Sequence, residues 1–212
     1  DESYEPRFTY HGFRYVEVTG YPGRPGLNAL EACFVHSGVR QAGTFERSHE
    51  LLNKIHACTI QSQRCNLQMG VPTDDTQREE RLGWCGDAWS YAIESFYNLD
   101  TVRLWEKWIA DFYDQQDEEL GIVGYICPLS GFGEDMVWSA AFVLIPWWMY
   151  VHHGDRRILE RSYPFLRKYI DYLERVGERD IPPLPPGQID KALLPRCGRR
   201  ERHLRERQRG WC

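Results

Sequence analysis

The residues with the clearest chemical potential lie in one short stretch, residues 71–87, which reads VPTDDTQREERLGWCGD. It contains five carboxylates, two arginines and a tryptophan. Carboxylates that lie close together raise one another's pKa, and an apolar wall favours the protonated form further. A carboxylic acid kept protonated in this way can donate a proton to a leaving oxygen, as glycoside hydrolysis requires. This stretch is therefore the first candidate for a catalytic site.

A simpler interpretation of the same residues is structural. Four neighbouring charged residues, Arg78, Glu79, Glu80 and Arg81, can form a patch of solvated ion pairs at the start of a helix. Each such pair stabilises a helix by only about 0.2–0.5 kcal/mol and needs no ligand. The stretch alone does not decide between the two interpretations, so the rest of the chain has to be considered.

Residues 73–87 resemble the signature of the bacterial α-L-rhamnosidases of glycoside hydrolase family 78, T-D-C-P-Q-R-(D/E)-E-R-L-G-W-T-G-D. The chain departs from this signature at Asp75 and Thr76, where the family usually has Cys-Pro, and at Cys85, where it usually has Thr. None of the three positions is a carboxylate that the family mechanism uses. The resemblance favours the catalytic interpretation over the solvated ion pairs.

The resemblance continues on both sides of this signature, from about Phe8 to about Leu173. Further matches occur in the family's order: residues 13–23, 43–48 and 51–55, Asn66, Lys107-Trp108, Asp111, Gln115, Trp138, Pro146-Trp147, Gly154-Asp155 and Tyr163-Pro164. A single short motif is weak evidence, but many matches in order are strong evidence.

The resemblance implies an inverting hydrolase of terminal α-L-rhamnosides, with carbohydrate as its partner and no cofactor. Glu80 would be the general acid that protonates the glycosidic oxygen. A second carboxylate, about 6.5–9.5 Å away, would activate water on the opposite face of the sugar. No position matches the family's second carboxylate, so we expect this chain alone to be inactive. The expected substrate-binding residues are Asp74, Arg78, Glu79, Arg81, Trp84, Asp87, Trp138 and Asp135, the last as a possible substitute for the missing base.

The sequence also allows two alternative functions. The chain could be a sugar-binding module without catalysis, or another (α/α)6 glycosidase such as a fucosidase or a glucuronyl hydrolase relative. The family often has W-G-D-A where this chain has residues 138–141, WSAA, so the substrate preference among rhamnosides is not predicted.

Hydrophobic periodicity predicts a mainly α protein with a short N-terminal β segment. We expect strands at residues 8–10, 13–18 and 32–36, and helices at about 48–70, 87–98, 101–115, 136–153 and 157–175, with Pro146 kinking or splitting the fourth helix. The resemblance implies that the helices form the first half of an (α/α)6 barrel. The predicted division is residues 1–44, the end of a β-domain; 45–177, the half-barrel; and 178–212, an aberrant Pro/Arg-rich tail, disordered or out of frame.

Composition limits the partners. The net charge is −5, and the basic tail leaves the remaining residues more acidic still, which argues against nucleic acid. Seven cysteines without a C-x-x-C pair predict free thiols, typical of the cytoplasm, and the only adjacent histidines, His152-His153, lack metal-ligand spacing. We expect no metal and no membrane segment. An open half-barrel would also expose apolar helix faces, so self-association is expected.

Overall fold

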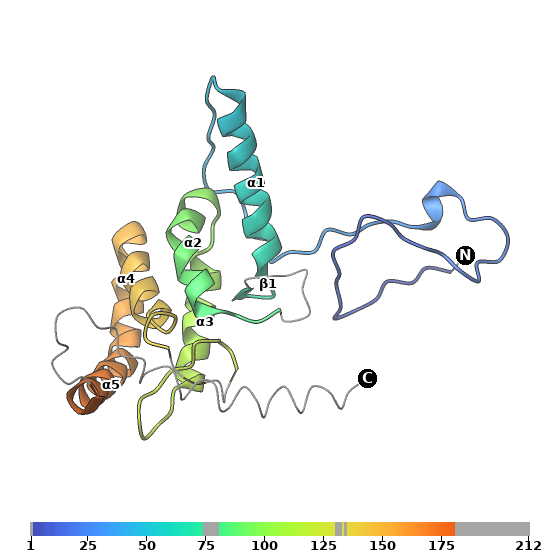
Figure 1. The fold of residues 1–212 in the computed structure, drawn as a ribbon. Helices are drawn as coiled ribbons and strands as arrows, with labels where there is room; N and C mark the ends of the chain where they lie inside the picture. Colours follow the sequence, from blue (N-terminus) through green and yellow to red (C-terminus); the bar gives the residue numbers. More distant parts are fainter. Residues whose placement is uncertain (1, 74–80, 130–132, 134, 181–212) are drawn as a thin grey trace.

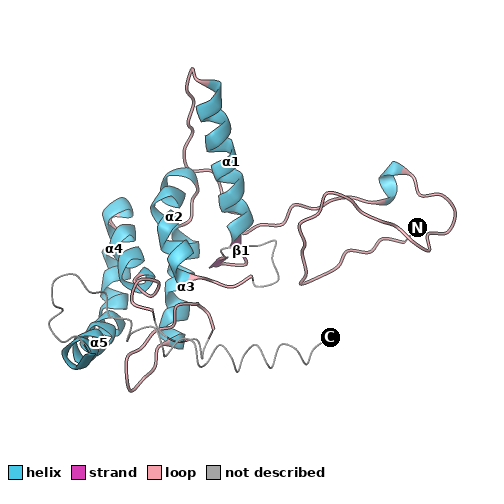
Figure 2. Cartoon of the chain, viewed as in Figure 1, coloured by secondary structure: helices cyan, strands magenta, loops and turns pink. Residues whose placement is uncertain are grey.

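The computed structural model describes residues 2–73, 81–129, 133 and 135–180, with side chains up to residue 177. These residues are mainly helical, as predicted (Figures 1 and 2). The helices are α1 (Glu50–Asn66), α2 (Cys85–Asn98), α3 (Val102–Gln115), α4 (Ala141–His153) and α5 (Arg156–Asp180), with a 3-10 turn η1 (Leu27–Ala29). Strands β1 (Leu67–Gln68) and β2 (Val71–Pro72) form an antiparallel pair after α1.

Helix α1 begins near the predicted residue but with a different cap. The predicted cap, Ser48, lies one residue before the observed N-cap, His49, whose side chain makes no capping hydrogen bond. Asn53 ties the approaching chain to the helix instead, because its Oδ1 accepts the Arg47 N–H (2.8 Å) and its Nδ2 donates to the Arg47 carbonyl (2.7 Å). The hairpin after α1 turns at Met69 and Gly70, both at positive φ (50° and 75°), as tight hairpin turns require.

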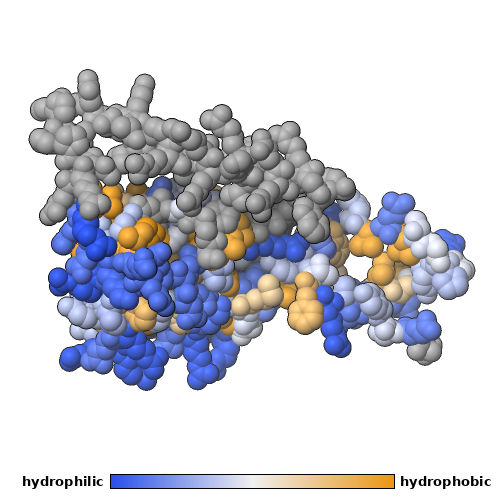
Figure 3. All heavy atoms as spheres, turned by 90° about the horizontal axis from the view of Figure 1, so that it is seen from below, coloured by the Kyte–Doolittle hydropathy of each residue, from blue (hydrophilic) through white to orange (hydrophobic). Residues whose placement is uncertain are grey.

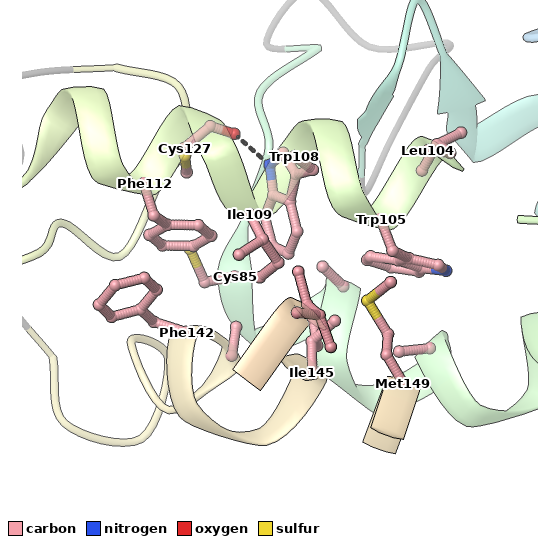
Figure 4. Close-up of a cluster of buried hydrophobic side chains, with 14 of the residues drawn as sticks. Cys85, Leu104, Trp105, Trp108, Ile109, Phe112, Cys127, Phe142, Ile145 and Met149 are labelled. Atoms are coloured by element: carbon pink, nitrogen blue, oxygen red, sulfur yellow. Dashed lines mark hydrogen bonds between the residues drawn. The ribbon is translucent and has the colours of Figure 1, made fainter. Parts of the chain in front are cut away.

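Helices α2, α3, α4 and α5 pack against one another around an aromatic core. Trp105, Trp108, Ile109 and Phe112 on α3 are fully buried, which confirms the predicted apolar face of that helix. They meet residues of α4, among them Phe142, whose ring stacks on Phe112 with centroids 5.1 Å apart (Figure 4).

Both buried indoles of α3 have a hydrogen-bond acceptor. Trp105 Nε1 donates to Ser95 Oγ (2.8 Å) and Trp108 Nε1 donates to the Cys127 carbonyl (2.9 Å), which is drawn in Figure 4. A buried indole N–H without an acceptor would carry a desolvation cost of about 1–3 kcal/mol. The bonds therefore let α3 bury two tryptophans, and the second bond fixes the loop that follows α3.

Helix α4 differs from the expected residues 136–153. It begins only at Ala141, because residues 136–140 form turns that Asp135 holds. The helix continues through Pro146 and is not split. Pro146 is buried together with Ile145 and Met149, so packing against the neighbouring helices offsets the backbone hydrogen bond that proline cannot donate.

The N-terminal residues 2–49 contain no strand of more than a single bridge, so the three strands predicted there are not formed. Most of this segment is extended and exposed, and Figure 1 shows it reaching away from the helices. A strand needs a neighbour to pair with, and the segment has one only near its end, where Gln41 bridges Leu99. Its alternating pattern therefore has no sheet to join among the described residues.

Candidate active site

The candidate site lies at the N-terminal end of α2, where residues 83–85 run antiparallel to residues 125–127 of the α3–α4 loop. Trp84 forms an antiparallel bridge with Ile126. The Cys85 N–H donates to the Tyr125 carbonyl (3.0 Å), and the Cys127 N–H donates to the Gly83 carbonyl (2.9 Å). These bonds fix the second half of the acidic motif against a loop that the sequence did not connect with it.

Two glycines of the motif are required by close contacts. A Cβ on Gly83 would lie 1.9 Å from the Cys127 carbonyl oxygen, so the two backbones approach closely only because this residue is glycine. A Cβ on Gly86 would lie 2.5 Å from Trp138 Cε2, so the Trp138 indole occupies the space beside this glycine. The predicted aromatic residues Trp84 and Trp138 are thereby brought to the same helix start.

Trp84 is half-buried and stacks on Tyr125, with ring centroids 5.6 Å apart and planes 25° from parallel. The Trp84 Nε1 is buried and has no hydrogen-bond partner among the described residues. Sequence reasoning missed Tyr125. Nothing in the loop marks this residue as functional, and a signal could have come only from knowing that residues 125–127 pair with the motif.

Asp87 lies exposed in the first turn of α2, where a negative charge is favourable beside the helix N-terminus. Its neighbour Cys85 is fully buried. Burial raises the pKa of the Cys85 thiol well above its usual range, and the Asp87 charge raises it further. Cys85 is therefore a neutral packing residue rather than a nucleophile.

Arg81 is held by the N-terminal segment and not by a carboxylate of the described part. Its guanidinium carbon lies 4.6 Å from the Tyr10 ring centroid, and its Nη2 donates to His11 Nδ1 (3.4 Å). The backbone of Arg81 has a φ of 48°, a left-handed conformation that is uncommon outside glycine. Besides its predicted roles, charge balance or sugar binding, Arg81 thus connects the start of α2 with the distant N-terminal segment.

Asp135 has a structural role that the sequence did not indicate. Its Oδ1 accepts the backbone N–H of Val137 (2.9 Å) and of Trp138 (3.0 Å). The carboxylate thereby holds the turn that carries the Trp138 indole to Gly86. Asp135 lies close to the aromatic wall, as we call Trp84 and Trp138 together, but one of its oxygens is already engaged by the backbone.

The predicted residues Asp74, Arg78, Glu79 and Glu80 lie outside the described residues. The residues at the two ends of that segment are placed. Thr73 is buried at the end of the hairpin, where its Oγ1 donates to the Asn66 carbonyl (3.1 Å), and Arg81 lies just before α2. The described chain is therefore placed on both sides of the acidic segment, at the hairpin and at the start of α2.

Two cavities in the described part lie away from this site. One, of about 550 Å³, is lined by residues that include Phe96, Leu99 and His153; the other, of about 670 Å³, includes Met69, Arg103 and Lys107. Both lie near the opposite end of α2 and contain none of the predicted site residues. Within the described ranges, no three His, Cys, Asp or Glu side chains are grouped to hold a metal, and no helix is long and apolar enough to cross a membrane.

The sequence profile of the bacterial α-L-rhamnosidase six-hairpin glycosidase domain matches residues 40–183. The chain belongs to this family. The profile of the bacterial α-L-rhamnosidase concanavalin-like domain matches residues 1–36. The predicted fold class, mainly α and part of an (α/α)6 six-hairpin barrel, is confirmed.

Curated α-L-rhamnosidases are similar over most of the chain. The enzyme of Streptomyces avermitilis is 37% identical over 176 residues, covering 82% of this chain and 17% of that protein. A relative from Formosa agariphila is 33% identical over 168 residues, covering 78% of this chain and 18% of its own length. The chain therefore spans about a fifth of the length of the relatives that it matches.

Solved structures agree with this assignment. The α-L-rhamnosidase from Dictyoglumus thermophilum superposes with a TM-score of 0.77 at 43% identity, covering 83% of this chain and 20% of that one. The Streptomyces avermitilis enzyme, solved in complex with L-rhamnose, superposes with a TM-score of 0.74 at 38% identity, covering 82% of this chain and 17% of that one.

Proposed function

We propose that this chain is the acid-bearing part of an inverting α-L-rhamnosidase that cleaves terminal α-L-rhamnosyl residues from rhamnosides. The observation that carries the proposal is the convergence of Trp84 and Trp138 at the start of α2, next to the segment that contains Glu80. Aromatic faces beside a carboxylic acid suit both sugar stacking and a raised pKa of the acid.

In this proposal each carboxylate of the motif has a role. Glu80 protonates the glycosidic oxygen, and the negative charge of Glu79 helps to keep Glu80 protonated. Asp74 and Asp87 hold hydroxyls of the rhamnosyl ring, while Arg78 and Arg81 balance the negative charge or bind sugar oxygens. Water attack from the opposite face requires a second carboxylate about 6.5–9.5 Å from the acid. Asp135 is the one residue of this chain considered for that role.

The domain division is part of the proposal. Residues 1–44 end a β-domain, 45–177 supply the first half of the barrel, and 178–212 form a separate tail. The two family matches, residues 1–36 and 40–183, support a change of domain near residue 40. Most of the tail lies outside the described residues.

A second candidate is a sugar-binding module without turnover. The backbone hydrogen bonds accepted by Asp135 favour it, because they engage the one carboxylate considered as a substitute base. Titration with L-rhamnose of a protein that also contains the remainder of the barrel, together with an assay on a nitrophenyl α-L-rhamnoside, separates the two. Binding without turnover supports the module, turnover supports the enzyme, and no binding of rhamnose would count against both.

A further inference from the structure

We propose that Tyr125 is a positioning residue of the rhamnosyl subsite, which holds the Trp84 indole in the orientation that sugar binding needs. This inference rests on the proposed function. It adds a residue that lies outside the acidic motif, on a loop between α3 and α4. Its basis is the stacking of the two rings and the way in which the loop is anchored.

The loop that carries Tyr125 is fixed to α3 by two side chains. Gln115 Nε2 donates to the Ile126 carbonyl (2.8 Å), and Trp108 Nε1 donates to the Cys127 carbonyl (2.9 Å). The same Gln115 accepts the Leu129 N–H through its Oε1 (2.8 Å). Trp108 is fully buried, so this anchor belongs to the core and holds the loop in one position.

The anchored loop then sets the position of the motif. The Tyr125 carbonyl accepts the Cys85 N–H, and Ile126 bridges Trp84, so residues 125–127 and 83–85 hold each other's backbones. A backbone bridge does not by itself orient a large side chain, since the indole can still rotate about its side-chain bonds. The stacked Tyr125 ring, 5.6 Å from Trp84, covers part of one indole face and restricts that rotation.

The two aromatic residues of the wall are thus held by different means. Trp138 is held by the turn that Asp135 caps and by its contact with Gly86. Trp84 has no polar anchor on its ring, because its Nε1 lacks a hydrogen-bond partner among the described residues. Among the described contacts, the stacked Tyr125 ring is therefore the one that orients the Trp84 indole.

The test combines two measurements on the full chain. The chain is labelled with 5-fluorotryptophan, the Trp84 ¹⁹F resonance is assigned with Trp84→Phe, and L-rhamnose binding is measured by calorimetry. Tyr125→Ala should shift or broaden the Trp84 resonance and weaken rhamnose binding by roughly 2- to 10-fold, the range expected for loss of one aromatic stack. Tyr125→Phe should keep the Trp84 resonance and the affinity close to those of the parent chain.

Tyr150→Ala is the matched control. Tyr150 also pairs with a tryptophan, Trp147 at 5.7 Å, but both rings lie on the same helix, α4, so this variant should change neither the Trp84 resonance nor the affinity. If the parent chain binds rhamnose and Tyr125→Ala binds equally well, the positioning role is wrong while the proposed function stands. If the parent chain does not bind rhamnose, the proposed function fails first, and this inference falls with it.

Discussion

At the scale of single residues, the functional proposal depends on Glu80 and on how its neighbour Glu79 affects it. Only one of two adjacent carboxylates can point at the glycosidic oxygen. The other can act only by shifting the pKa of the first. Glu79 and Glu80 should therefore respond differently to the same substitution, although they differ in sequence by one position.

We expect Glu80→Gln, in a protein that also contains the remainder of the barrel, to abolish hydrolysis of natural rhamnosides. More activity should remain on a nitrophenyl rhamnoside, because its phenolate leaves without a proton. A general acid contributes about 10²–10⁴-fold to rate, which sets the size of the loss. Steady-state kinetics on both substrates are the measurement. Glu79→Gln is the control and should cost less; equal losses on both substrates, or a larger loss for Glu79→Gln, would reassign the acid.

Gly83→Ala should destabilise the chain by about 1–3 kcal/mol, the usual cost of inserting a methyl group into a packed site. The reason is the contact of 1.9 Å that its Cβ would make with the Cys127 carbonyl oxygen. Denaturant unfolding measures the loss. Gly133→Ala is the control, since its Cβ would meet only Tyr125 Cε1, at an ordinary 3.9 Å. Equal stability of the two variants would show that the two backbones can separate at little cost.

At the scale of elements, an aspartate holds the chain before each of two helices, α4 and α5. Asp135 caps the turn before α4 and carries Trp138 to Gly86. Asp155 plays a similar role before α5, where its Oδ1 accepts the Arg157 N–H (3.0 Å) and both its oxygens bind the Arg157 guanidinium. Hydrogen bonds from Arg157 lower the pKa of Asp155 to about 2.

This lowered pKa predicts a pH-dependent contribution to stability. A carboxyl whose pKa is lower in the folded chain than its unfolded value of about 3.9 stabilises the fold above that value and loses the effect as pH falls towards 2. Thermal unfolding of the parent chain and Asp155→Asn should therefore differ most above about pH 4 and converge below it. The pair is partly solvated, so the difference should also shrink with added salt. A constant difference across this pH range would mean that packing, not charge, accounts for the effect.

At the scale of the whole molecule, apolar side chains remain exposed on two helices. On α1 they are Leu51, Leu52 and Ile55, and on α4 they include Trp147 and Val151, each at least 45% exposed. The face seen in Figure 3 is largely hydrophilic, with apolar side chains in smaller groups. Helix α1 has only one buried residue, Gln63, so its apolar side chains contribute little to the core.

We expect the isolated chain to self-associate through these exposed helix faces, because contiguous apolar surface beyond a few hundred Å² promotes association. Sedimentation velocity over a range of concentrations is the measurement. The double variant Trp147→Glu/Val151→Glu should reduce association if α4 takes part. Leu27→Glu, at a fully exposed position of the N-terminal segment, is the control and should not. A monodisperse monomer that unfolds cooperatively would contradict the expectation.

The sequence by itself predicted the chemistry and determined most of the helices. The order of the motif residues carried the family and the predicted acid, and the local period of apolar residues predicted α2 and α3 almost to the residue, because helix hydrogen bonds are local. It failed at residues 8–36, where a β pattern has meaning only beside a partner strand, and at residues 136–140, where the Asp135 cap delays the helix.

Only the tertiary structure decided which residues meet at the site. The contact of Trp138 with Gly86, the stack of Tyr125 on Trp84 and the cation–π contact of Tyr10 with Arg81 each join residues distant in sequence. No local pattern encodes such contacts, because they depend on how far each loop reaches once the α3 core has fixed its ends. The motif thus predicts which groups act, and the packing of the α3–α4 loop decides where the aromatic wall stands.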